Sequence, residues 1–253
     1  MIYLAVHNMK GGVGKTATAV NLAYLAADEG ARVLLWDLDP QGASSFYLRI
    51  RDKVKGGARK LIQGKKDLLS LVKATDFERF DLLPADMSYR NFDILLDAEK
   101  KSTRRLRQLM KPLGNDYDIV LLDCPPGLTL LSENILRAAD AIIVPLIPTT
   151  LSIRSHEQTV EFCRENDIRT PNFLPFFSMV DRRKKLHREL TQDETRKALG
   201  ILSSAIPYSS DIERMGIERA PVPAFAPRTT AAGCYRALWR EIRDRLPART
   251  RRA

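Results

Sequence analysis

From Asn8 to Thr16 the chain reads Asn8-Met9-Lys10-Gly11-Gly12-Val13-Gly14-Lys15-Thr16. An apolar run, residues 2–6, precedes this segment, and a helix-forming run, residues 17–27, follows it. A strand, a glycine-rich turn and a helix in this order point successive backbone N–H groups inward, which makes a nest for phosphate. Glycines allow the backbone to approach the phosphates closely. The pattern places the Lys15 ammonium on the β- and γ-phosphates and the Thr16 hydroxyl on Mg²⁺.

The segment departs from the common P-loop at its start. Met9 stands where the common pattern has its first glycine, and Lys10 precedes the two adjacent glycines. A lysine at this position is not needed to grip the phosphates from within, because Lys15 and the backbone amides already do so. The alternative is a glycine turn with two surface lysines.

The run Lys-Gly-Gly-Val-Gly-Lys-Thr resembles the deviant P-loop of the ParA/MinD family of dimerising ATPases. The resemblance implies that Lys10 reaches across a homodimer to the partner's nucleotide. It also implies ATP and Mg²⁺ as cofactors, with Lys10, Lys15 and a later aspartate as the catalytic residues. The expected ATP contacts are Lys10, Gly11, Gly12, Val13, Gly14, Lys15, Thr16 and Ala17.

A second polar segment follows the apolar run that starts at Arg32. It reads Asp37-Leu38-Asp39-Pro40-Gln41-Gly42. Residues two apart in a strand point to the same face, so Asp37 and Asp39 both point toward the phosphate site. Pro40 holds the preceding residue extended. In the resembled family this segment is the first switch, which implies that Asp39 orients or activates the attacking water and that Asp37 lies near Mg²⁺. The alternative is a polar strand end.

The third signal is the run from Tyr117 to Gly127. Its four consecutive aliphatic residues, 119–122, predict a central parallel strand that is buried on both faces. Asp123 ends this strand, where open α/β sheets bind their ligands. We therefore expect Asp123 to be the Walker B aspartate and to hold Mg²⁺ together with Thr16. Pro125-Pro126-Gly127 resembles the second switch of the family.

Strands and helices alternate along the whole chain. The pattern predicts an α/β fold with a doubly wound, mostly parallel sheet and helices on both faces. The 253 residues, 44% of them apolar, suffice for a single P-loop ATPase domain over residues 1–253. We expect helices at 67–73, 91–100 and 102–113, and a solvated insertion at 46–66 that contains a basic loop and a short helix.

Charge is distributed unevenly. The net charge is +10, and residues 182–253 hold 17 Lys and Arg against 8 Asp and Glu, a difference of +9. Such a basic carboxyl-terminal third is the electrostatic footprint of a polyanion partner. The alternative is a solubilising surface. The DNA-binding candidates are Arg182, Arg183, Lys184, Lys185, Arg214, Arg219, Arg236 and Arg240.

The last helical segment carries an apolar stripe at helical spacing, surrounded by arginines. The stripe consists of Tyr235, Leu238, Trp239, Ile242 and Leu246. We expect it to dock on the sheet of its own chain. The alternative is a membrane-surface helix, as in the MinD branch, but Trp239 is its one large aromatic anchor. Pro247 and the polar tail 249–252 also argue against the membrane.

Other features limit the location and the chemistry. No run approaches the roughly 20 apolar residues of a membrane span, and a strand starts directly after Met1, so we expect a cytoplasmic protein that associates with the nucleoid. Cys124, Cys163 and Cys234 lack C-x-x-C spacing, so neither a disulfide framework nor a metal cluster is indicated. A metabolic or metal-cluster enzyme on this scaffold, as in the nitrogenase iron protein, would need a partner for Cys124.

The resemblance covers most of the chain and implies a function. It implies slow ATP hydrolysis that a ParB-like adaptor stimulates, and a cycle that partitions or positions a cargo (plasmid, chromosome locus or protein cluster) over the nucleoid. The P-loop starts at residue 8, so we expect no amino-terminal winged helix and therefore sequence-nonspecific DNA binding through phosphate contacts. By the same resemblance Met179, Asp181 and Pro207 approach the adenine.

Overall fold

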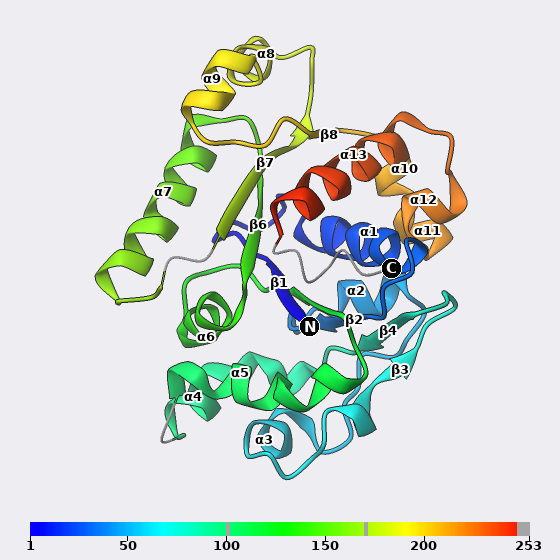
Figure 1. The fold of residues 1–253 in the computed structure, drawn as a ribbon, viewed down its shortest axis with the longest axis vertical. Helices are drawn as coiled ribbons and strands as arrows, with labels where there is room; N and C mark the ends of the chain where they lie inside the picture. Colours follow the sequence, from blue (N-terminus) through cyan, green and yellow to red (C-terminus); the bar gives the residue numbers. More distant parts are fainter. Residues whose placement is uncertain (100–101, 170–171, 247–253) are drawn as a thin grey trace.

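The computed structural model describes residues 1–99, 102–169 and 172–246. An eight-stranded sheet forms its centre, with the strand order β3-β4-β2-β5-β1-β6-β7-β8 (Figure 1). Every neighbouring pair is parallel except β3 and β4. The strands are β1 Ile2–Val6, β2 Val33–Asp37, β3 Lys73–Ala74, β4 Phe80–Leu83, β5 Ile119–Asp123, β6 Ala141–Leu146, β7 Asn172–Val180 and β8 Ala205–Pro207.

Helices connect the strands and cover both faces of the sheet (Figure 1). The α-helices are α1 Lys15–Asp28, α2 Ala43–Tyr47, α3 Gly57–Ile62, α4 Phe92–Asp97, α5 Arg105–Met110, α6 Leu130–Ala138, α7 Thr150–Glu165, α8 Lys185–Leu190, α9 Asp193–Ala198, α10 Ser210–Glu213, α11 Met215–Glu218, α12 Val222–Phe225 and α13 Thr230–Arg245. The 3₁₀ segments are η1 Leu69–Leu71, η2 Met87–Asn91, η3 Ser102–Arg104 and η4 Lys111–Asn115. The expected doubly wound α/β fold is confirmed.

Alternate residues of the central strands enter two separate cores. Leu4 of β1 packs with α1 and α13, whereas Ala5 packs with α3 to α6 on the opposite face. Strands β2 and β5 follow the same alternation, so Leu35 and Leu121 face α1. Two residues further along, Asp37 and Asp123 continue on that face. The strand period therefore delivers both carboxylates to the side of the sheet on which α1 begins.

The last helix docks on its own chain, as expected. All five stripe residues, four in α13 and Leu246 directly after it, are buried in the core that also contains α1. At the edge of the stripe, the Trp239 indole N–H donates to Glu29 Oε2 at 2.9 Å, and Arg243 forms an ion pair with the same carboxylate at 2.7 Å. Pro247 and the tail 249–252 lie outside the described residues. None of the helices that the structure describes has the length and apolar character of a membrane span.

Three expectations for the middle of the chain need correction. Residues 67–73 hold the short turn η1 and the first residue of β3 instead of a helix. The helices at 91–100 and 102–113 are shorter than expected: α4 follows the 3₁₀ segment η2 and ends at Asp97, and α5 lies between η3 and η4. Residue 100 lies outside the described residues. The 46–66 segment is not a solvated insertion, because its inner residues Val54, Ala58 and Leu61 are buried in the core beside α4 and α5.

Candidate nucleotide-binding site

The glycine-rich segment forms a tight loop between β1 and α1. Gly12 has φ 71° and Gly14 has φ 89°, a left-handed region that residues with a Cβ rarely adopt. A Cβ on Gly14 would lie 3.0 Å from the Ser178 hydroxyl of β7, so the loop also approaches its neighbour too closely for a larger residue. Gly11 and Gly12 are exposed and Val13 is buried beneath them. The loop ends at the first turn of a 14-residue helix, whose free N–H groups favour an anion.

Lys15 lies inside this loop. Its side chain is buried, and its ammonium donates to the Lys10 carbonyl oxygen at 2.8 Å. Burial lowers the pKa of Lys15, and the negative charges of Asp123 and Asp39 partly oppose that effect. A cation that is held in the loop close to two carboxylates is placed to neutralise phosphate charge.

Lys10 points away from the loop interior. Its ammonium donates to the Leu151 carbonyl oxygen at 2.8 Å, at the start of α7. Leu151 is 65% exposed, so this contact lies at the molecular surface. The backbone N–H of Lys10 donates to Asn8 Oδ1 at 2.9 Å, which fixes the turn while leaving the side chain outside. Two lysines of one loop therefore take different directions.

Two aspartates lie side by side at the carboxyl ends of β2 and β5. Asp37 and Asp123 are paired in register, and both are fully buried. Asp123 Oδ2 accepts from the Ser44 hydroxyl at 2.8 Å. Asp37 Oδ2 accepts from the backbone N–H and the hydroxyl of Ser45, each at 2.8 Å. The first turn of α2 thus binds to both carboxylates.

Burial dominates the electrostatics of this pair. It raises the pKa of Asp37, and the neighbouring Asp123 charge raises it further. Burial also raises the pKa of Asp123, although the Ser44 hydrogen bond, the nearby Thr16 hydroxyl and the nearby Lys15 charge lower it in part. Buried carboxylates without a compensating cation are costly, so this edge of the sheet favours an added positive charge.

The donor set fits Mg²⁺. Asp123 Oδ1 is buried and has no hydrogen-bond partner among the described residues. The Thr16 side chain lies beside the same carboxylate. Mg²⁺ is a hard cation that usually takes one or two protein oxygens and completes its shell with phosphate and water. No group of three His, Cys, Asp or Glu able to hold a metal occurs in the part of the chain that the structure describes.

Asp39 lies just beyond β2, in the turn before α2. Its backbone N–H donates to Asp37 Oδ1 at 3.3 Å, and its own Oδ1 accepts from the Gln41 N–H at 3.0 Å. Leu38 packs into the opposite core, as the alternation predicts. Asp39 is close enough to influence the pKa values of Lys15 and Asp123. The expected grouping of Asp39 with the phosphate loop is therefore present in the geometry.

The Pro125-Pro126-Gly127 turn is bonded to the phosphate loop. The Gly127 N–H donates to the Met9 carbonyl at 3.0 Å, and the Gly127 carbonyl lies 3.1 Å from His7 Nε2. Burial lowers the pKa of His7 to about 4, so the ring is neutral at physiological pH. Because a carbonyl only accepts, the Nε2 atom carries the proton and donates. Because of these two contacts, a movement of the phosphate loop would displace the Pro-Pro-Gly turn, and the reverse holds as well.

The sequence reasoning missed four residues that shape the site. Ser44 and Ser45 hold the two aspartates, Ser178 lies beneath Gly14, and His7 ties the loop to the Pro-Pro-Gly turn. A signal existed for the two serines, because hydroxyl residues in the first turn of a helix after an Asp-x-Asp-Pro segment are placed to bond carboxylates. For His7 and Ser178 the partners come from distant parts of the chain.

The three expected adenine neighbours lie at one edge of the sheet. Strands β7 and β8 are paired with Val180 opposite Pro207, and Asp181 follows β7 directly. Met179 has a left-handed φ of 56°, which is unusual for a residue with a side chain. The Asp181 carboxylate bonds the Arg183 side chain at 2.9 Å, and this hydrogen bond lowers the pKa of Asp181.

The eight DNA-binding candidates are spread over three places: the loop after β7, the ends of α11, and α13. Several have local partners. Arg214 pairs with Glu218, Lys185 pairs with Glu189 at 3.7 Å, and the Arg236 side chain donates to a backbone carbonyl at 2.8 Å. Arg182, Lys184 and Arg240 are exposed and have no ion pair among the residues described.

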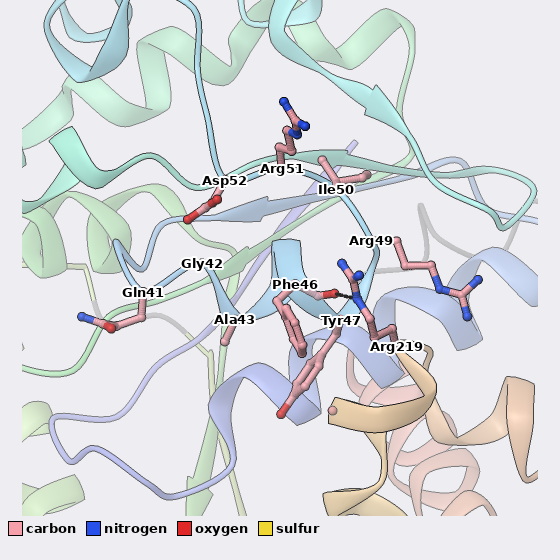
Figure 2. Close-up of a pocket in the computed structure, with 11 residues that line it drawn as sticks. Gln41, Gly42, Ala43, Phe46, Tyr47, Arg49, Ile50, Arg51, Asp52 and Arg219 are labelled. Atoms are coloured by element: carbon pink, nitrogen blue, oxygen red, sulfur yellow. Dashed lines mark hydrogen bonds between the residues drawn. The ribbon is translucent and has the colours of Figure 1, made fainter.

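A cavity of about 810 Å³ opens beside the Asp39–Gly42 turn (Figure 2). One wall is the turn and α2, and the other includes Arg219 beyond α11. The Arg219 guanidinium lies 4.7 Å from the centre of the Phe46 ring and its Nε donates to the Phe46 carbonyl at 2.9 Å. This contact joins α2, which directly follows the predicted first switch, to the basic carboxyl-terminal third.

A phosphate nest between β1 and α1, with the acidic ends of β2 and β5 beside it, defines a P-loop nucleotide-binding protein. Residues 1–172 match AAA_31, a family described as an AAA domain. The chain is 32% identical to the chromosome partitioning protein ParA of Caulobacter vibrioides over 251 residues, which covers 96% of this chain and 94% of that protein. It therefore belongs to the ParA/MinD family of P-loop ATPases.

Two further comparisons agree. The sporulation initiation inhibitor protein Soj of Bacillus subtilis is 29% identical over 246 residues, 94% of this chain and 97% of Soj. Among solved structures, cobyrinic acid a,c-diamide synthase from Mycobacterium smegmatis, with a bound ATP analogue and magnesium, superimposes with a TM-score of 0.81. It is 28% identical, and the match covers 96% of this chain and 94% of that one.

Proposed function

We propose that this chain is a ParA-like ATPase that forms a homodimer when it binds ATP and Mg²⁺, and that it hydrolyses ATP slowly. In the dimer, Lys10 of each subunit completes the site of the other. The dimer binds DNA without sequence preference, and a ParB-like adaptor protein stimulates hydrolysis, which releases the DNA. Such a cycle partitions or positions a cargo over the nucleoid.

The direction of Lys10 is the observation that carries the proposal. Lys15 already fills the interior of the loop, whereas the Lys10 ammonium rests on a backbone carbonyl at the surface. A hydrogen bond to a surface carbonyl exchanges readily with water, so the free energy needed to release Lys10 is small, about 1 kcal/mol. Lys10 is therefore available to a second subunit that approaches this face.

The remaining residues have roles that follow from their positions. The backbone from Gly11 to Ala17 binds the phosphates, and Thr16 and Asp123 hold Mg²⁺, which supplies charge neutralisation on the phosphate oxygens. Asp37 sits next to the metal position and anchors α2 through Ser45. Asp39 orients the attacking water, and Met179, Asp181 and Pro207 form the adenine side.

The membrane-cycling alternative receives no support from the geometry. A membrane-surface helix needs its apolar face free, but the apolar stripe of α13 is buried in the core that also holds α1. Insertion would require this helix to leave the fold and expose Tyr235, Leu238 and Trp239.

The test is the substitution Lys10→Ala, with Lys65→Ala as the matched control at an exposed position far along the chain. We expect Lys10→Ala to bind ATP within about twofold of wild type, because the cation inside the loop is intact. We expect it to lose the nucleotide-dependent dimer in light scattering with a nonhydrolysable ATP analogue, and to lose turnover by roughly 10³-fold, the lower range for a cation supplied in trans.

The control should dimerise and hydrolyse ATP as wild type does. Full turnover by wild-type protein that stays monomeric at all concentrations would contradict the proposal, as would a Lys10→Ala protein that keeps both properties.

A further inference from the structure

A second cavity lies at the edge of the sheet opposite the phosphate loop. Its volume is about 640 Å³, and Tyr3 of β1 contributes to its wall. The other wall residues precede the first residues of β5, β6 and β7, and parallel strands begin at one common edge. The cavity therefore belongs to the amino-terminal edge, whereas the nucleotide site occupies the carboxyl-terminal edge.

Positive side chains dominate the wall of this cavity. It contains five cations and one carboxylate, that of Asp167, which leaves a difference of +4. The cations are Arg104, Arg107, Lys111, Arg137 and Arg169. None of them belongs to the basic carboxyl-terminal third, so this charge cluster is separate from the DNA-binding candidates.

Three of the cations share one face of a helical segment. Arg104, Arg107 and Lys111 are spaced by three and four residues across η3, α5 and η4, the spacing that places side chains on one side of a helix. Arg137 at the end of α6 and Arg169 beyond α7 contribute the other side. Figure 1 shows α5 and α6 next to each other below the sheet. Cations from three separate parts of the chain thus converge.

Two of the arginines are held in place by the fold. The Arg107 guanidinium lies 5.8 Å from the centre of the Tyr3 ring and donates to the Ala138 carbonyl at 3.4 Å. Arg137 pairs with Glu133 at 2.7 Å and donates to the Asn166 carbonyl at 2.7 Å. Side chains that are already ordered lose little entropy when they bind a ligand.

The other three cations lack such partners. Arg104, Lys111 and Arg169 are exposed, and no carboxylate of the described residues lies within 4.0 Å of them. Like charges that line one hollow repel each other and concentrate anions there. Guanidinium groups match phosphate oxygens in geometry. The cluster is therefore built for an anion with several phosphate groups.

The shape of the site selects a compact ligand. A volume of about 640 Å³ falls within the roughly 300–1,000 Å³ of small-molecule sites, and Tyr3 in its wall is only 7% exposed. The phosphates of a duplex line a convex surface and do not reach into such a hollow. We propose that this cavity binds a small polyphosphorylated anion, either inorganic polyphosphate or a nucleoside polyphosphate, independently of the P-loop.

The test uses the full chain saturated with ADP and excess Mg²⁺, so that the phosphate loop is filled. Isothermal titration with inorganic tripolyphosphate should show one further site per chain. The double substitution Arg104→Glu/Lys111→Glu should weaken this binding at least tenfold. Both positions are exposed, so the fold should survive, which a thermal melt checks. Arg90→Glu/Arg228→Glu, an equal charge change at exposed positions elsewhere, should stay within twofold of wild type.

A comparison of two ligands identifies the anion that binds in this cavity. Uridine triphosphate that binds this site more tightly than tripolyphosphate would assign a nucleoside polyphosphate, and weaker binding would assign the inorganic anion. Three results would overturn the proposal. The wild-type protein could lack a second site, both double variants could lose binding equally, or duplex DNA could displace tripolyphosphate.

Discussion

Asp37 and Asp123 show how one residue pair can favour ligand binding at the expense of stability. Two carboxylates on neighbouring strands are buried together, and one oxygen of Asp123 has no hydrogen-bond partner among the described residues. Removal of a buried unpaired charge is stabilising when an isostere of similar shape replaces it. A functional site of this kind lowers the stability of the ligand-free protein, and binding of a cation then offsets that loss.

We therefore predict that Asp123→Asn raises the stability of the nucleotide-free protein while it abolishes Mg²⁺-dependent ATP hydrolysis. Burial raises the folded pKa of Asp123 from the ordinary value of 3.8 to about 6, so the fold loses stability as the pH rises between these two values, and the whole loss is present above pH 6. A shift of this size corresponds to about 3 kcal/mol as an upper value. Urea unfolding at pH 8 should show a gain of about 1–3 kcal/mol.

The sign of the pH dependence gives a second readout. Between pH 3.8 and about 6 the wild-type group is protonated in the folded state and ionised in the unfolded state. The advantage of asparagine should therefore stay constant from pH 8 to about 6 and shrink as the pH falls further toward 4. Ser203→Ala, at an exposed position outside the site, serves as the control. A variant that is less stable than wild type at pH 8 would contradict the electrostatic account.

At the scale of residues, the sequence predicts the position of side chains that lie next to a strand end or a turn in the chain itself. Lys10, Lys15, Thr16 and Asp123 each stand at a fixed distance from a strand end or a glycine turn, and the fold keeps that local relation. His7 and Ser178 could not be found in the same way, because the residues they contact, Gly127 and Gly14, lie 120 and 164 residues away in the chain. Only the assembled sheet brings those atoms together.

At the scale of elements, the packing of α13 decides between two interpretations of its sequence, a helix docked on its own chain and a membrane anchor. The same amphipathic pattern predicts both, since periodicity shows that one face is apolar but not what covers it. Here α1 and β8 pack against it, and Trp239 is 3% exposed with its N–H bonded to Glu29. The stripe therefore contributes to the stability of the fold.

We predict that Trp239→Ala lowers the free energy of unfolding by about 3–5 kcal/mol, as for a large aromatic side chain removed from a core. Arg240→Ala, its exposed neighbour, should change that free energy by less than about 0.5 kcal/mol. Chemical denaturation measures both.

A separate experiment tests membrane binding. Co-sedimentation of wild-type protein with anionic liposomes should stay at background with ATP. Strong ATP-dependent sedimentation together with an unchanged stability of Trp239→Ala would show that the helix serves the membrane.

The middle of the chain shows where sequence patterns fail at the scale of elements. Residues 67–73 have leucines that suit a helix, but Leu68 and Leu71 fill the core beneath a short turn, and Lys73 pairs with β4 as an antiparallel edge strand. Tertiary packing overrides local propensity in such short segments. The long parallel strands were predictable because they are apolar on both faces.

At the scale of the whole molecule, the proposed function depends on the distribution of charge together with dimerisation. Of the net charge of +10, +9 lies in residues 182–253, which leaves +1 for residues 1–181, where the phosphate loop lies. One subunit presents a modest number of unpaired cations, so the proposal predicts that its affinity for DNA is low. Two linked subunits bind with an effective concentration that raises the affinity without any new contact. DNA binding should consequently follow the nucleotide state.

The decisive measurement is DNA affinity with ATP, with ADP and without nucleotide, over a range of salt concentrations. We predict tight binding with ATP alone, and a steep linear fall of the logarithm of the affinity with the logarithm of the salt concentration. Arg182→Glu/Lys184→Glu should lower the affinity for all sequences and reduce the slope by about 1 for each phosphate that the variant no longer binds. Arg51→Glu/Lys55→Glu, an equal charge change at exposed positions outside residues 182–253, should keep the slope. In this proposal ATP binding causes dimerisation, and dimerisation raises the affinity for DNA. We therefore expect Lys15→Ala, which removes the cation inside the phosphate loop, to lose DNA binding as well. If that variant bound DNA at the wild-type level, DNA binding would not depend on the ATPase cycle.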